Sequence, residues 1–209
     1  MTPQTYAWPV DGPLHLSVRL GHGSLTIDAR EDVTEAVVTL TPVDADGLDR
    51  FTVDLRGRTL VVHAPRNSGW RRGRGAVDVT IVVPAGTTAK LATATADISV
   101  TGRLADADVA AGTAVVDVAT VTGNLRARVG AGSTSVGTAH GDVDLAAGSG
   151  TLTVGIPEGV SVRLDVRTGS GVLRSDLPVE DGPKAGSRAV SLRARIGRGD
   201  VHLVRAPAA

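Results

Sequence analysis

Two aspartates near the middle of the chain are the residues best spaced to do chemistry. Asp142 and Asp144 are separated by one residue, so in an extended strand both carboxylates lie on the same face. Hydrolysis of a glycosidic bond uses such a carboxylate pair. The alternative is a ladder of charges on a solvent-facing strand, with Arg126 one repeat earlier as the cation. The chain has only four aromatic residues from which to build a sugar platform. We therefore favour the ladder and predict no catalytic residues.

A basic segment with one aromatic residue is the second candidate site. Arginine side chains match the geometry of phosphate, and an aromatic ring can stack on a base, so this composition is typical of a nucleic-acid contact. The alternative is a solvated loop between strands. Because 22 basic residues balance 22 acidic residues, no overall field draws the chain toward nucleic acid or an anionic membrane. We predict neither partner. The segment consists of Arg66, Trp70, Arg71, Arg72 and Arg74.

Residues for metal, thiol or nucleophile chemistry do not converge. The chain has no cysteine, which excludes disulfides and thiolate metal sites. Gly148-Ser149-Gly150 has no strand-to-helix context for a nucleophile elbow, and Arg198-Gly199-Asp200 is interpreted as a turn entering a strand rather than as an integrin-binding tripeptide. We predict no metal site and no cofactor. The five histidines show no metal-ligand spacing: they are His15, His22, His63, His140 and His202.

A repeat of 18 residues provides the elements that must position these side chains. Valines recur at this interval, and two series of glycines follow the same period. A single coil so short cannot bury its own apolar face, so successive coils must stack. The repeat predicts an all-β fold: a short parallel β-solenoid of about 18-residue coils with β caps at both ends. The repeated residues are Val100, Val118, Val136, Val154 and Val172, with Gly112, Gly130 and Gly148, and Gly123, Gly141 and Gly159.

Alternation within the repeat predicts which side chains face inward. Apolar residues occupy every second position, and the residues between them are polar. We predict inward columns of Val116, Thr134 and Leu152, of Val118, Val136 and Val154, of Leu125 and Val143, and of Ala127 and Leu145. We predict an outward column of Asp117, Ser135 and Thr153. The glycines are placed at corners, where a positive φ costs them little.

The repeat predicts three regions, residues 1–94, 95–172 and 173–209, within what we expect to be one continuous domain. The first is a β meander or cap, the second the repeats, and the third a Pro/Gly/Asp-rich loop at Leu177–Ser187 followed by closing strands at Ala189–Ile196 and Asp200–Val204. The apolar phase slips by one after Gly159. Strands are expected in the first region at Leu14–Leu20, Ser24–Ala29, Glu35–Thr41, Arg50–Leu55, Thr59–His63 and Ala76–Val83.

Location and assembly follow from what the chain lacks. The opening residues, MTPQTYAWPVDGPLHL, have no basic region followed by an apolar run, and no apolar stretch is long enough for a membrane span. We expect a cytoplasmic protein. Because unpaired strand edges promote association and both ends are predicted to be capped, we expect a monomer or small closed oligomer. The partner is predicted to be an unidentified protein or a second copy.

Several unlike segments occur in an order that resembles the DUF4097 family. These are VDVTIVVPAGTTAKLATATADISVTGRL, the Gly-Asp-Val turns at His140–Val143 and Arg198–Val201, RLDVRTGSGVLRSDLPVEDGP and SLRARIGRGDVHLVRA. The family is common in actinobacteria and carries the label "putative adhesin". The resemblance implies a β-strand-repeat fold with no assigned biochemical role. We predict a non-enzymatic scaffold or binding protein. Two alternatives stay open: a carbohydrate-active enzyme on a solenoid face, and a cytoplasmic regulatory partner of a neighbouring gene product.

Overall fold

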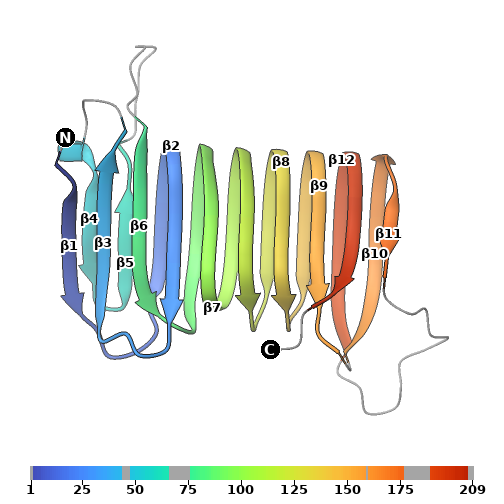
Figure 1. The fold of residues 1–209 in the computed structure, drawn as a ribbon, viewed down its shortest axis with the longest axis horizontal. Coiled ribbons are helices and arrows are strands. Elements are labelled where there is room, and N and C mark those ends of the chain that lie inside the picture. Colours follow the sequence, from blue (N-terminus) through green and yellow to red (C-terminus); the bar gives the residue numbers. More distant parts are fainter. Residues whose placement is uncertain (1, 44–47, 66–75, 159, 177–188, 207–209) are drawn as a thin grey trace.

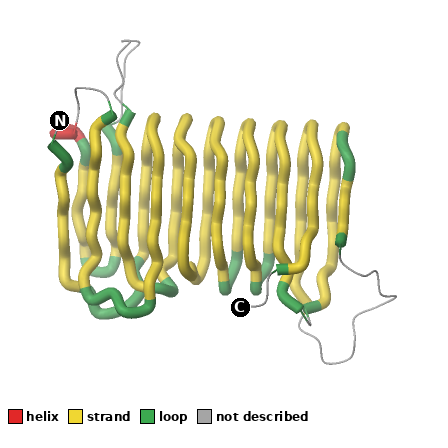
Figure 2. Tube along the Cα trace, in the orientation of Figure 1, coloured by secondary structure: helices red, strands yellow, loops and turns green. Residues whose placement is uncertain are grey.

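The chain folds into one twelve-stranded sheet that winds along a single axis (Figure 1). The computed structural model describes residues 2–43, 48–65, 76–158, 160–176 and 189–206. Apart from one short 3-10 turn, Leu48–Arg50, the regular structure is all strand, with loops gathered at the strand ends (Figure 2). The predicted all-β class is confirmed. The strands are β1 Gln4–Pro9, β2 His15–Arg30, β3 Glu35–Pro42, β4 Thr52–Arg56, β5 Thr59–His63, β6 Val77–Pro84, β7 Thr87–Val121, β8 Leu125–Ala139, β9 Val143–Ile156, β10 Ser161–Ser170, β11 Leu173–Ser175 and β12 Ala189–Arg205.

Neighbouring turns of the chain pair in parallel with the predicted 18-residue offset. Val118 is opposite Val136, and Val136 is opposite Val154. The same offset joins the two halves of β7, where the Thr122 amide donates to the Leu104 carbonyl at 3.0 Å. The column through Val118, Val136 and Val154 is therefore a physical ladder, as the repeat predicts. The expected continuation to Val172 is wrong, because Val154 is opposite Leu203 of β12.

The sheet is mixed rather than wholly parallel. Strands β2, β7, β8, β9, β12 and β10 follow one another in parallel, and β2 also pairs in parallel with β5 and β6. Antiparallel pairs occur toward the N-terminal end, where β1 pairs with β3, β3 with β6, and β4 with β5. Parallel pairing already begins at β2, before residue 95. The division into three regions stays a prediction.

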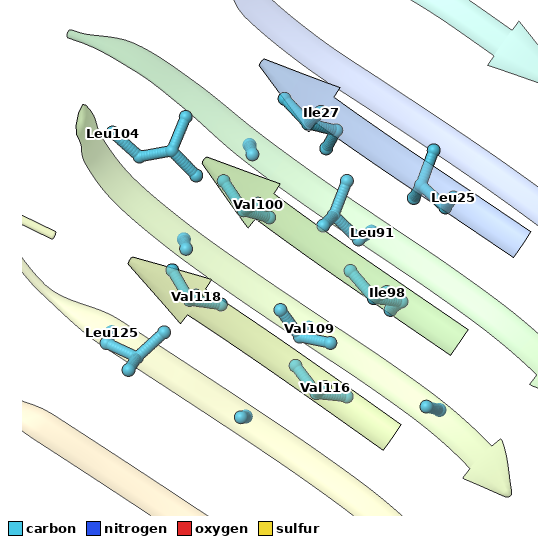
Figure 3. Packing of buried hydrophobic residues seen from close by; sticks show 14 of the residues in the cluster. Leu25, Ile27, Leu91, Ile98, Val100, Leu104, Val109, Val116, Val118 and Leu125 are labelled. Atoms are coloured by element: carbon cyan, nitrogen blue, oxygen red, sulfur yellow. The ribbon is translucent and has the colours of Figure 1, made fainter. Parts of the chain in front are cut away.

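The core lies between two layers of strand, and its composition follows from the alternation. Side chains from the first half of each turn, such as Val109 and Leu125, face side chains from the second half, such as Val116 and Val118 (Figure 3). The predicted inward columns are buried, whereas Asp117 is exposed. Thr134 is the one polar member of these columns, and its buried hydroxyl has no hydrogen-bond partner. Small aliphatic side chains thus fill this thin core, and Tyr6, Trp8 and Phe51 pack against it only as partly buried residues.

The corner glycines are required for a reason that differs from the predicted one. At Gly130 a Cβ would lie 2.5 Å from the Gly112 carbonyl oxygen, so close approach of neighbouring turns excludes a side chain. The positive φ occurs two residues later, at Gly132 (125°) and Gly150 (133°). A Cβ at Gly150 would overlap the Gly132 carbonyl oxygen. The corners at Gly130–Gly132 and Gly148–Gly150 thus use two glycines, the first for space and the second for both space and backbone conformation, whereas the equivalent corner at Gly112 has Ala114 in the second position.

The prediction that β12 closes the end of the stack is wrong. β12 lies inside the stack, between β9 and β10, with Leu192 opposite Val143 on one side and Leu164 on the other (Figure 1). The outermost strands at this end are β10 and β11. The insertion also accounts for the slip in apolar phase, because β10 is two strands away from β9 and its register is set by β12. The predicted loop at Leu177–Ser187 falls outside the described residues.

A matched pair of substitutions in β9 tests which side chains face inward. Val154 is fully buried between Val136 and Leu203, whereas the adjacent Thr153 lies on the outer face beside Ser135 and His202. Val154→Asp places an unpaired charge in the core and should destabilise the fold by at least about 3 kcal/mol. Thr153→Asp should stay within about 0.5 kcal/mol of the parent. Chemical denaturation measures both, and equal losses would show that the faces are assigned wrongly.

Candidate binding groove

A lateral groove crosses successive turns of the stack on the outer face of their first halves. It has a volume of about 730 Å³ and is lined by residues of β7, β8, β9 and β12. Ala107, Leu125 and Val143 are among the lining residues, but their side chains are buried in the core, so the open surface of the groove comes mainly from the polar and charged residues between them. Asp142, Asp144 and Arg126, the residues singled out from the sequence, all line this groove.

The parallel register arranges the charges of this face in one row of alternating sign. Asp108 is opposite Arg126, Arg126 is opposite Asp144, and Asp144 is opposite Arg193. Arg193 is in turn opposite Asp165 in β10, and the 18-residue offset within β7 brings Lys90 beside Asp108. We call this row the charge ladder. Its members are Lys90, Asp108, Arg126, Asp144, Arg193 and Asp165.

Two neighbouring pairs of rungs form ion pairs that remain open to water. The Arg126 Nε lies 3.5 Å from the Asp144 Oδ2, and the Arg193 Nε lies 3.4 Å from the Asp165 Oδ2. Asp165 also pairs with Arg167 of its own strand, at 3.4 Å. Exposed ion pairs of this kind contribute at most about 1 kcal/mol each. The ladder therefore stabilises the fold little, and its main consequence is the pattern of charge that it presents.

A second set of aspartates caps backbone amides of the neighbouring turn. The Ser191 amide donates to Asp142 Oδ1 at 2.9 Å, and the Asn124 amide donates to Asp106 Oδ1 at 2.7 Å. Asp97 and Asp200 accept amides of neighbouring turns in the same way. These carboxylates satisfy donors where the backbone ladder is interrupted. Asp142 and Asp144 thus share the groove, but each has its own partner in a different turn.

The other sequence candidates are not brought together in the described part of the chain. The basic segment at residues 66–75 lies outside it. His63 Nε2 is 3.0 Å from Ser17 Oγ, and Gly148-Ser149-Gly150 forms a corner of β9. Arg198-Gly199-Asp200 lies within β12. Among the described residues, no group of three acidic or histidine side chains is arranged to hold a metal ion. No helix there has the length and apolar character of a membrane span.

One carboxylate outside the groove has a displaced pKa. The Arg30 Nε donates to the Asp28 Oδ2 at 2.6 Å, and this hydrogen bond lowers the pKa of Asp28 and raises that of Arg30. Both residues lie near the end of β2, and Arg30 is largely exposed. The pair is an ordinary surface contact between residues two apart on one strand.

Sequence reasoning found one pair of rungs and missed the rest of the ladder. Lys90, Asp108, Arg126 and Asp144 stand at intervals of 18 residues, so the repeat itself carried the signal for the first four. Arg193 and Asp165 fall outside that period because β12 is inserted before β10.

Comparison with solved structures gives the fold a precedent. The chain is similar to a "putative cell adhesion protein" from Clostridium sporogenes, with 14% identity, a TM-score of 0.56 and coverage of 98% of this chain and 100% of that one. A "putative adhesin" from Bacteroides fragilis has 14% identity, a TM-score of 0.48 and coverage of 97% of each chain. No family model matches the chain, and no curated protein matches it. At these identities the likeness concerns the fold alone.

Removing a capping carboxylate tests its structural role. Asp142→Ala leaves the Ser191 amide without its acceptor and should cost about 1 kcal/mol of unfolding free energy. Asp142→Asn keeps an acceptor oxygen and should recover most of that loss. Asp117→Ala is the matched control, because Asp117 is exposed and accepts no hydrogen bond. Denaturant titration compares the variants. A loss of the same size at Asp117 would contradict the capping role of Asp142.

Proposed function

We propose that the chain is a non-enzymatic binding scaffold built as a β-solenoid, and that it binds a protein partner along the lateral groove. The observation that carries this proposal is the charge ladder, a row of six alternating charges held in register by consecutive turns. The resemblance to DUF4097 and the adhesion-protein fold precedent support the same class of function.

Alternation of sign determines which partners the groove favours. A polyanion or a polycation laid along the ladder would meet as many repulsive rungs as attractive ones. A protein surface carries both signs, and complementary charges set the register and selectivity of such contacts. A protein partner therefore suits this groove better than nucleic acid or an anionic membrane.

The rigidity of the stack favours binding over chemistry. From Lys90 to Arg193, each rung stands on a strand whose opposite face is packed into the core, so this part of the row is preorganised and little ordering is needed on binding. The aspartates that would act on a sugar are already engaged, Asp142 with the Ser191 amide and Asp144 with Arg126. No aromatic side chain lines the groove within the described residues. A carbohydrate-active enzyme is the weaker alternative for these reasons. The cytoplasmic location and the regulatory alternative stay predictions.

Reversing two rungs tests the groove as the binding face. The double variant Arg126→Glu, Arg193→Glu turns the mixed row into an almost wholly acidic one, and we expect it to lose partners that the parent protein retains from an extract of its host. The matched control reverses Arg56 and Arg103, exposed arginines outside the groove, and should retain them. Partner retention should also weaken with added salt. Identical captured proteins for all three forms would contradict the proposal. Circular dichroism checks that each variant is folded.

A second experiment addresses catalysis directly. We expect the purified protein to release no sugar from a panel of polysaccharides and aryl glycosides, because neither carboxylate is free and the groove lacks an aromatic platform. Turnover that disappears in the double variant Asp142→Asn, Asp144→Asn would overturn the non-enzymatic proposal. Turnover that survives in that variant would point to a contaminating hydrolase.

A further inference from the structure

The end of the stack formed by β10 and β11 is incompletely covered. Both strands pair with β12 on one side only, and no strand of the described chain pairs with their other edge (Figure 1). An unpaired edge presents backbone donors and acceptors that can bind a further strand. This edge therefore has the hydrogen-bonding capacity to continue the sheet.

Of the five exposed large apolar side chains in the described chain, Leu164, Val172 and Leu173 lie at this end, whereas Val43 and Val115 lie elsewhere. Leu164 is 41% exposed, whereas Leu192 and Val143 in the same column are 0% and 2% exposed. Leu173, which continues the column of the buried Leu152 and Val201, is 43% exposed. The inward columns of the core thus continue into the last turn without being sealed. A further turn of strand on this edge would bury these side chains, as each earlier turn buries those of its neighbour.

The sequence of β10 is complementary to itself in the antiparallel direction. Residues 162–166 read Val-Arg-Leu-Asp-Val, so pairing two copies about Leu164 places valine opposite valine and leucine opposite leucine. In the same register Arg163 of each copy is opposite Asp165 of the other. The apolar residues lie on the inner face, because Val162 and Leu164 align with the buried Val190 and Leu192. Opposite charges paired across strands are favourable.

We propose that this end binds a second copy of the chain, with the two β10 strands antiparallel and centred on Leu164. A half-turn within the plane of the sheet places β10 against β10 and β11 against β11, so both layers continue across the contact. Such an interface uses the same surface twice and closes into a dimer. It also lengthens the row of alternating charge, since Asp165 of one copy meets Arg163 of the other.

The opposite end of the stack is less suited to this role. One of its two edge strands, β1, is flanked by Pro3 and ends at Pro9, and proline cannot donate a backbone hydrogen bond, whereas the other, β4, contains no proline. β10 contains no proline. Joining the β10 end to the β1 end would also generate an open filament instead of a closed pair. The contrast between the two edges favours the symmetric contact.

Sedimentation velocity over a range of concentrations tests the proposal. The parent protein should show a reversible monomer–dimer equilibrium. Arg163→Asp places two aspartates opposite each other at both symmetric positions and should raise the dimer dissociation constant at least tenfold. The double variant Arg163→Asp, Asp165→Arg restores opposite charges across the interface and should recover most of that affinity. The matched control, Arg128→Asp, is an equally exposed reversal on β8 and should leave the equilibrium unchanged.

Three results would overturn the proposal. A parent protein that is monomeric at every concentration has no such interface, and one that grows into chains of indefinite length uses both ends. A dimer insensitive to Arg163→Asp would be held by another surface, or by exchange of β12 between copies. Because Arg163 is exposed, the variant should remain folded, and circular dichroism with a thermal melt verifies this.

Discussion

The parallel register between consecutive turns is the constraint on which the other features depend. A shift of one residue would turn every inward side chain outward, and the columns through Val118, Val136 and Val154 hold only at one offset. Close stacking of the corners imposes a second requirement, because carbonyl oxygens such as that of Gly112 occupy the space that a Cβ of the next turn would need. The valine columns in the core and the glycines at the corners therefore both require the same 18-residue offset between turns.

The inner face of each strand stabilises the fold, and the outer face is available for binding. Burial of aliphatic side chains supplies the stability, and exposed ion pairs add little. The identity of the residues at outer positions therefore has little effect on stability, so these positions can carry the pattern of charge that a partner requires. The regular alternation of charge from Lys90 to Asp165 therefore matters for what the surface presents to a partner. It requires little further stabilisation, because the core already fixes the strands that carry these residues.

Sequence alone predicted those parts of the fold in which strands that pair are one 18-residue repeat apart in the chain. The columns from Val116 to Val154 are of this kind. The position of β12 was not predictable in this way, since Arg193 lies 49 residues from Asp144 and 28 from Asp165, and no period connects them. β1 was also missed, because its short alternating segment lies between prolines. In the groove, Arg126 and Asp144 were paired correctly, but the capping role of Asp142 depends on Ser191, which only the inserted strand brings near.

The insertion of β12 has a consequence for synthesis on the ribosome. Once the N-terminal strands have paired, the turns from β7 to β9 can add to the stack in the order in which they emerge, each next to a neighbour that is already in place. β10 and β11 emerge next, but their pairing partner is β12, which has not yet been translated. These strands cannot pair until β12 has been translated, and the edge of β9 must remain unpaired until then. Folding of this end is thus delayed by translation itself, and it is the step at which a nascent chain has the greatest exposure to chaperones and to neighbouring nascent chains.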